Sequence, residues 1–198
     1  MVRLLVVRHG RTGHNAAHLI QGQLDVELDD TGRAQAVAVA PRLAAFEPVA
    51  IVSTDLRRAA DTAAPLAALT GLPIHLDQRL RERSFGDWQG LHGTEIAERY
   101  PAEHARWRAG QEVDGCAVEG TDELAKRASE ALEDAATEAP EGTVVVFSHG
   151  GTSRHGMAAL FGWSPEVLRS FAPLGNCRWI ELRRDSERGW QLRGYNLG

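Results

Sequence analysis

The chain is poor in several features that would assign it to a specialised class of protein. It has two cysteines, Cys116 and Cys177, which are far apart and form no CxxC pair. Neither a disulfide framework nor a thiolate zinc site is therefore expected. No run of eighteen apolar residues occurs, and the N-terminal MVRLLVVRHG stretch is too short and too charged for a signal peptide. We expect a cytoplasmic protein that does not associate with membranes.

Lysine is nearly absent as well. Lys126 is the only one, so almost every cation in the chain is an arginine. The formal net charge of -5 argues against a general nucleic-acid binder, which would normally be basic. Any anion site in this chain must therefore be built from arginine or histidine.

The pattern of apolar residues predicts one α/β domain spanning residues 1–198. The chain has no internal repeat, low-complexity tract or linker, and 198 residues fit one domain. Strands are expected at 3–7, 49–53, 74–76 and 143–147, with an antiparallel edge pair at 177–182 and 190–195. Helices are expected at 31–46, with Thr31 as a candidate cap, and at 57–70, 94–108, 121–138 and 150–161. This alternation predicts a three-layer α/β/α sandwich around a mostly parallel sheet with an antiparallel edge strand.

Two of the predicted strands lead into a His-Gly pair. Strand 3–7 is followed by Arg8, His9 and Gly10, and strand 143–147 by Ser148, His149 and Gly150. The carboxyl ends of parallel strands meet at one edge, where ligands gather. Glycine allows close backbone approach, and the helix after Gly150 is expected to offer free N–H groups to an anion. Together with arginines after two strands, this pattern predicts a site for a dianion such as phosphate.

Four blocks of sequence resemble the histidine phosphatase superfamily, also called phosphoglycerate mutase-like. The blocks are Arg8-His9-Gly10-Arg11-Thr12 with Asn15 and Gln21-Gly22, then Ser53 to Ala59 with Thr62-Ala63, then Leu80 to Gly90, and finally Ser148 to Gly151. They span residues 3 to 161 in the order found in that family. The resemblance implies a phosphoglycerate mutase-like fold and a metal-independent phosphatase that acts through a phosphohistidine, with no cofactor.

The resemblance also implies roles for individual residues. His9 is the expected nucleophile, His149 a donor opposite it, and Glu82 the acid that protonates the leaving oxygen. The expected phosphate ligands are Arg8, Arg58, Asn15, Gln21, Gly22 and Gly150, although Gln21 and Gly22 can equally be turn residues. Arg57 competes with Arg58 for the clamping position, and Asp87 and Glu95 compete with Glu82 for that of the acid. Arg11 stands where the family often has Glu or Gln, and faces either substrate or solvent.

The substrate is expected to be a small phosphate monoester, and several members of the family could supply the activity. Mutases of the family carry inserted segments and a C-terminal tail that this sequence lacks, so a phosphatase is favoured over a phosphoglycerate mutase. The blocks look most like those of glucosyl-3-phosphoglycerate phosphatases, with a broad-specificity acid phosphatase, an α-ribazole phosphatase and a fructose-2,6-bisphosphatase-like enzyme as alternatives. A non-catalytic module that binds phosphoproteins is the alternative from another class. The last strands fit either a homodimer edge or a bare edge strand.

Overall fold

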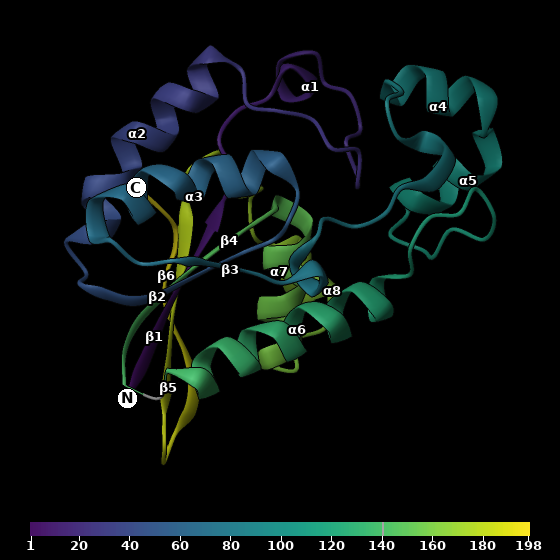
Figure 1. Ribbon diagram of the computed structural model, residues 1–198. Coiled ribbons are helices and arrows are strands. Elements are labelled where there is room, and N and C mark those ends of the chain that lie inside the picture. Colours follow the sequence, from purple (N-terminus) through teal and green to yellow (C-terminus); the bar gives the residue numbers. More distant parts are fainter. Residues whose placement is uncertain (140) are drawn as a thin grey trace.

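The computed structural model describes residues 1–139 and 141–198, and a six-stranded sheet forms its centre (Figure 1). The strand order is β3-β2-β4-β1-β5-β6. The first four are parallel: β3 (Ile74–Leu76), β2 (Pro48–Ser53), β4 (Gly142–Ser148) and β1 (Val2–Arg8). Beyond β1, β5 (Trp179–Asp185) pairs antiparallel with both β1 and β6 (Gly189–Leu197). The predicted parallel sheet with an antiparallel pair at one edge is confirmed.

Helices cover both faces of the sheet because successive strand side chains point to opposite sides. Leu5, Val7 and Phe147 pack on one face against α2 (Asp30–Ala44) and α3 (Arg57–Thr70). Leu4 and Val6 pack on the other face against α6 (Thr121–Glu138) and α7 (Gly150–Leu160). The three-layer sandwich expected from the sequence is confirmed, and its central strands are buried on both sides.

The shorter helices lie outside the two main layers. Beyond the carboxyl ends of the parallel strands, Figure 1 shows α1 (Gly13–Ala16), α4 (Gly93–Arg99) and α5 (Pro101–Arg108). The segment containing α4 and α5 has its own apolar cluster around Trp88, Ile96 and Val113. Helix α8 (Pro165–Arg169) follows α7, and two 3-10 turns cover Gln78–Leu80 and Gly86–Trp88.

Two local expectations were wrong. The helix expected at 94–108 is two helices, because Pro101 keeps the preceding residue out of the helical region. Tyr100 accordingly has φ −133° and ψ 57°, and Pro101 begins α5. Helix α2, expected to begin with Thr31 as its cap, is capped by Asp29. The Asp29 carboxylate accepts a hydrogen bond from the Gly32 N–H at 2.7 Å.

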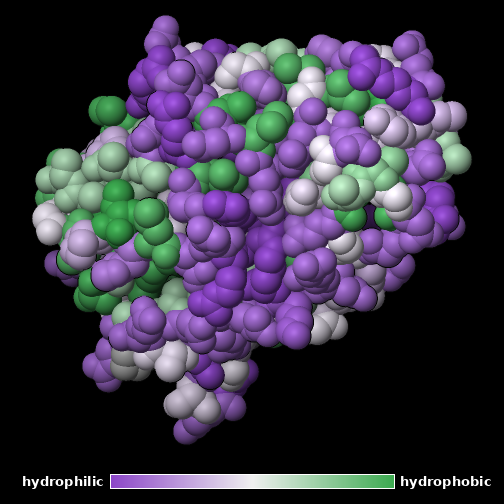
Figure 2. Space-filling model, turned by 45° about the vertical axis from the view of Figure 1, so that its right-hand side comes forward, coloured by the Kyte–Doolittle hydropathy of each residue, from purple (hydrophilic) through white to green (hydrophobic). Residues whose placement is uncertain are grey.

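The surface is largely hydrophilic on the side drawn in Figure 2, where strongly hydrophilic residues gather at the centre and apolar residues toward the left. Among the described residues, no helix combines the length and apolar character needed to span a membrane. The large apolar side chains are mostly in the two cores flanking the sheet.

Candidate active site

His9 and His149 lie side by side at the carboxyl ends of β1 and β4. These strands are neighbours in register, with Arg8 opposite Ser148. The His9 N–H donates to the Ser148 carbonyl oxygen at 3.0 Å, and the two imidazole rings are 5.2 Å apart between centroids. Both side chains are buried. The expectation that the two His-Gly pairs share one sheet edge is confirmed.

The geometry around His9 fixes which ring nitrogen carries the proton. His9 Nδ1 is 2.7 Å from the Gly10 carbonyl oxygen. A carbonyl can only accept, so Nδ1 donates and Nε2 keeps its lone pair. Burial, followed by the charges of Arg58 and Arg8, holds the pKa of His9 well below its usual range. A neutral imidazole with a free Nε2 is the form needed for nucleophilic attack.

Arg8 and Arg58 are held by backbone carbonyl oxygens. Arg58 Nη1 and Nη2 donate to the carbonyls of Leu24 and Gly22 at 2.8 and 2.7 Å, and Arg8 Nη1 donates to the carbonyl of Leu174. Burial lowers the pKa of Arg58 to about 10 and also lowers that of Arg8, while the Glu82 carboxylate opposes both shifts. Both guanidinium groups therefore remain charged at neutral pH.

Several buried polar atoms at this edge have no partner in the described part of the chain. They are Arg8 Nε, Arg58 Nε and both ring nitrogens of His149. Burial, followed by the charge of Arg58, holds the pKa of His149 well below its usual range, so its ring is neutral and offers one N–H and one acceptor nitrogen. Buried polar atoms are normally hydrogen-bonded. A cluster of unpaired donors beside two guanidinium charges is what an anion-binding position requires.

Glu82 lies at the N-terminus of α7. Its Oε2 accepts from the Gly151 N–H at 3.0 Å, and its Oε1 accepts from the N–H and the hydroxyl of Thr152, each at 3.0 Å. The expectation that N–H groups after Gly150 are free for an anion is therefore wrong for Gly151 and Thr152, because the Glu82 carboxylate occupies them. Gly150 itself lies against Arg8, whose Nε is 3.5 Å from where a Cβ would be.

The residues that compete with Glu82 and Arg58 face solvent or make contacts elsewhere. Asp87 is exposed, and Glu95 caps α4, where it accepts from the His92 N–H at 2.9 Å. Arg57 is exposed and pairs with Glu27, whereas the neighbouring Arg58 is fully buried. Of these alternatives, Glu82 contacts Gly151, two residues after His149, and Arg58 is buried with its charge acting on both histidines.

Asn15 and Gln21 contact Thr12 in the loop after β1, and Gly22 contacts Arg58. The Asn15 Oδ1 accepts from the Thr12 N–H at 3.2 Å, so its Nδ2 is the group left to a ligand. The Gln21 Oε1 lies 2.9 Å from the Thr12 hydroxyl. Gly22 has φ 52°, and a Cβ there would lie 2.1 Å from Gln89 Oε1. Gly22 thus supports the site through its carbonyl, which holds Arg58.

Asn176 contacts the loop of residues 9–12, called the nucleophile loop after the expected role of His9. The sequence alone gave Asn176 no role. Its Nδ2 donates to the His9 carbonyl oxygen at 2.9 Å and lies 3.4 Å from Asn15 Oδ1. The adjacent Cys177 N–H donates to the Arg8 carbonyl at 3.0 Å. This turn precedes β5, which pairs with β1, so the contact depends on a sheet order that apolar patterning does not reveal.

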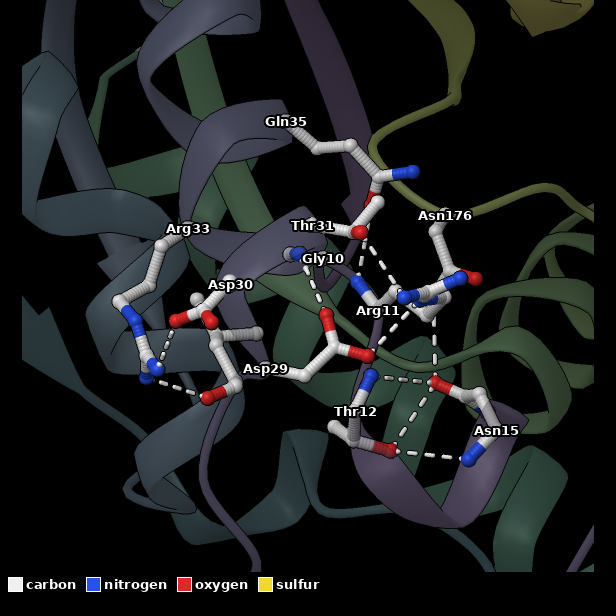
Figure 3. Close-up of polar contacts among 12 residues, drawn as sticks. Gly10, Arg11, Thr12, Asn15, Asp29, Asp30, Thr31, Arg33, Gln35 and Asn176 are labelled. Carbon is white, nitrogen blue, oxygen red and sulfur yellow. Dashed lines mark hydrogen bonds and ion pairs between the residues drawn. The ribbon is translucent and has the colours of Figure 1, made fainter. Parts of the chain in front are cut away.

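The Arg11 side chain lies beside Asp29 and Thr31 (Figure 3). Its guanidinium donates from Nε to Asp29 Oδ2 and from Nη2 to the Thr31 hydroxyl, both at 2.8 Å. Its N–H also donates to Gln35 Oε1 at 2.9 Å. Arg11 therefore ties the loop after β1 to the first turns of α2, while 41% of its side chain remains exposed to solvent.

No metal-binding group accompanies these residues. Within 1–139 and 141–198, no three His, Cys, Asp or Glu side chains gather closely enough to hold a metal ion. Positive charge at the sheet edge comes from Arg58, which is buried, and from Arg8, which is partly buried.

Comparison with known proteins gives a consistent result. A sequence model of the histidine phosphatase superfamily (branch 1) matches residues 4–198. The glucosyl-3-phosphoglycerate phosphatase of Mycolicibacterium vanbaalenii is 36% identical over 211 residues, covering 98% of this chain and 94% of that protein. The metal-independent phosphoserine phosphatase of Arabidopsis thaliana is 40% identical over 159 residues, covering 78% of this chain and 66% of that protein. The structure of a mycobacterial glucosyl-3-phosphoglycerate phosphatase in complex with VO3 superimposes with a TM-score of 0.90 at 36% identity, covering 99% of both chains.

Proposed function

Since this chain belongs to the histidine phosphatase superfamily, we propose that it hydrolyses phosphate monoesters of small metabolites through a phosphohistidine formed on His9. One observation carries the proposal: a neutral imidazole with a free Nε2 lies beside buried, unpartnered donors of Arg8, Arg58 and His149. Such an arrangement offers a nucleophile for phosphorus together with donors for its oxygens.

In the first step, His9 Nε2 attacks phosphorus and the bond to the ester oxygen breaks. Glu82 gives its proton to that leaving oxygen, and the alcohol departs. Negative charge spread over the equatorial oxygens is stabilised by Arg8, Arg58 and the N–H of His149. The guanidinium groups are already desolvated and held by carbonyls, so little reorganisation is needed as the charge develops.

In the second step, water attacks the phosphohistidine. The Glu82 carboxylate takes a proton from the water, the P–N bond breaks, and inorganic phosphate leaves with His9 returned to its neutral form. The Asn15 Nδ2, the Gln21 amide and the backbone at Gly22 and Gly150 complete the proposed phosphate contacts. In this scheme arginine supplies the positive charge, so the reaction uses neither a metal ion nor a cofactor.

The substrate class follows from the relatives. Similar proteins are named for glucosyl-3-phosphoglycerate and for phosphoserine, both small phosphate monoesters. We propose glucosyl-3-phosphoglycerate as the preferred substrate, because the relative named for it matches almost the whole chain. Other sugar and glycerate phosphates are expected to be used less efficiently.

The test is a phosphate-release assay in EDTA with p-nitrophenyl phosphate, phosphoserine, 3-phosphoglycerate and glucosyl-3-phosphoglycerate. Hydrolysis that is insensitive to EDTA and absent from His9→Ala is the expected result. Exchange of 3- and 2-phosphoglycerate without net phosphate release would instead identify a mutase. Tight binding of phosphopeptides with no turnover of any ester would identify a binding module.

A further inference from the structure

The backbone of Gly10 is hydrogen-bonded on both sides of its Cα. Its carbonyl oxygen accepts from His9 Nδ1 at 2.7 Å, and its N–H donates to the hydroxyl oxygen of Thr62 at 2.9 Å. Thr62 is on α3 and fully buried. The same hydroxyl lies 2.6 Å from the carbonyl oxygen of Arg58, one helical turn earlier.

The directions of these bonds are unambiguous. The Arg58 carbonyl can only accept, so the Thr62 hydroxyl proton points to it, and the Thr62 oxygen accepts from Gly10. Hydrogen bonds therefore connect the backbone of α3 to Gly10 through Thr62, and Gly10 to the imidazole of His9. The Gly10 N–H and carbonyl belong to two peptide groups joined at the Cα, so the link between Thr62 and the ring passes through the position of the Gly10 backbone.

The bond from the Gly10 N–H to Thr62 adds to the packing against α2 in restricting the Gly10 backbone. A Cβ at Gly10 would lie 2.6 Å from the Gly32 carbonyl oxygen, so the close approach of α2 requires glycine here. Glycine has the widest choice of backbone angles of any residue. The orientation of the Gly10 carbonyl, and with it the proton on His9 Nδ1, therefore depends on the bond that holds the Gly10 N–H.

We propose that Thr62 is a positioning residue for the nucleophile: its hydroxyl fixes Gly10 so that the Gly10 carbonyl keeps the His9 ring in the attacking tautomer and orientation. The inference rests on the proposed role of His9. Thr62 also links the proposed nucleophile to the proposed phosphate clamp. Its hydroxyl is bonded to the carbonyl of Arg58, and the Arg58 guanidinium is part of that clamp.

Two substitutions of Thr62 and one matched control test the proposal. Thr62→Val keeps the shape but removes the hydroxyl, and Thr62→Ser keeps the hydroxyl. Thr70→Val is the control, because Thr70 makes the same bond to a carbonyl one turn earlier in α3, at 2.9 Å to Leu66, without reaching the nucleophile loop. The measurements are kcat and KM on a phosphate ester, thermal unfolding, and the tautomer of His9 from ¹⁵N NMR.

We expect Thr62→Val to lose roughly 10²-fold in kcat with KM within about threefold, since small misplacements of a reacting group have effects of this size. Its His9 ring should show both tautomers, whereas Thr62→Ser and Thr70→Val keep wild-type kcat within about threefold. Wild-type kcat in Thr62→Val, or Thr62→Ser as impaired as Thr62→Val, would overturn the proposal.

A purely structural role for Thr62 gives a different result. It predicts a lower melting temperature in Thr62→Val with an unchanged tautomer and unchanged kcat below that temperature. If Thr62→Val does not fold, the wild-type spectrum still decides, because a His9 proton on Nε2 in the wild type would refute the inference. His9→Ala separates the two proposals: turnover surviving there would refute the nucleophile, whereas turnover lost there but intact in Thr62→Val would refute only the positioning role.

Discussion

Replacing Glu82 by glutamine is expected to change two properties at once, because the same carboxylate caps α7 and is the proposed proton donor. Oε1 accepts three hydrogen bonds, from the N–H and hydroxyl of Thr152 and from the Arg83 N–H, while Oε2 accepts one from Gly151. Glutamine can keep its oxygen at the Oε1 position. Its amide nitrogen then faces the Gly151 N–H, and two donors meet.

The stability change can be worked from these contacts. A hydrogen bond to a charged group contributes about 1.5–3 kcal/mol, and a negative charge at a helix N-terminus about 0.3–1 kcal/mol. Losing one such bond and the charge should lower the free energy of unfolding by about 2–4 kcal/mol. For a domain of this size that corresponds to a fall of roughly 4–16 °C in melting temperature.

The kinetic change should depend on the leaving group. General acid catalysis contributes roughly 10²–10⁴-fold when the departing oxygen needs a proton. Glu82→Gln should therefore lose that factor in kcat/KM on an alkyl phosphate such as 3-phosphoglycerate, because kcat/KM reports the first step and not the water step that Glu82 also serves. With p-nitrophenyl phosphate, whose leaving group departs as a stable anion, the loss should be within about tenfold.

A matched control separates stability from chemistry. Asp29→Asn also removes a carboxylate from a helix N-terminus, where Asp29 accepts from the Gly32 N–H and pairs with Arg11. It should lower the melting temperature without changing the ratio of the two rates. Equal losses of kcat/KM on both esters in Glu82→Gln, measured below its melting temperature, would refute the assignment of Glu82 as the acid.

Three further predictions concern the charges near the site. Burial, followed by nearby charges, holds the pKa of His9 and of His149 well below that of the unfolded chain, so the unfolded state binds more protons as pH falls below about 6.5. Stability should fall there with a slope approaching about 1.4 kcal/mol per pH unit for each histidine, and the slope from urea midpoints should be smaller in His149→Gln. Arg58→Met removes a cation that lowers the pKa of His9, so the acid limb of kcat/KM should move to higher pH; an unmoved limb would contradict this. Arg11→Ala should cost about 0.5–1 kcal/mol of stability and leave KM within about twofold, and a larger KM change would place Arg11 at the substrate.

The strand ends were predictable from the sequence for a physical reason. Aliphatic runs of five residues buried on both faces indicate parallel strands, and parallel strands bring their carboxyl ends to one edge. The His-Gly pairs after β1 and β4 therefore had to lie near one another, and the structure places Arg8 opposite Ser148. Arg58 was distinguishable from Arg57 only through the family resemblance, since burial on α3 depends on helix rotation.

Contacts between loops were not predictable in the same way. Asn176 reaches His9 because β5 pairs with β1, and apolar patterning gives strands but not their order. The cap of α2 is instead a local contact, from the Gly32 N–H to the Asp29 carboxylate, and Asp29 and Thr31 are both favoured cap residues by type. The break before Pro101, by contrast, carries a sequence signal, since the residue before a proline avoids the helical region.

The division of charge between histidine and arginine follows from burial. Removing both imidazoles from water keeps them neutral, which gives His9 its lone pair and makes His149 a donor without charge. Guanidinium groups, with a much higher intrinsic pKa, remain charged under similar burial. A lysine would be more easily neutralised in such a position, so arginine is the cation that can accompany a buried neutral nucleophile. Once the second ionisation of the phosphate itself, with a pKa of about 6, is allowed for, phosphate affinity in this site should follow the arginines and change little as pH passes through the usual range of histidine.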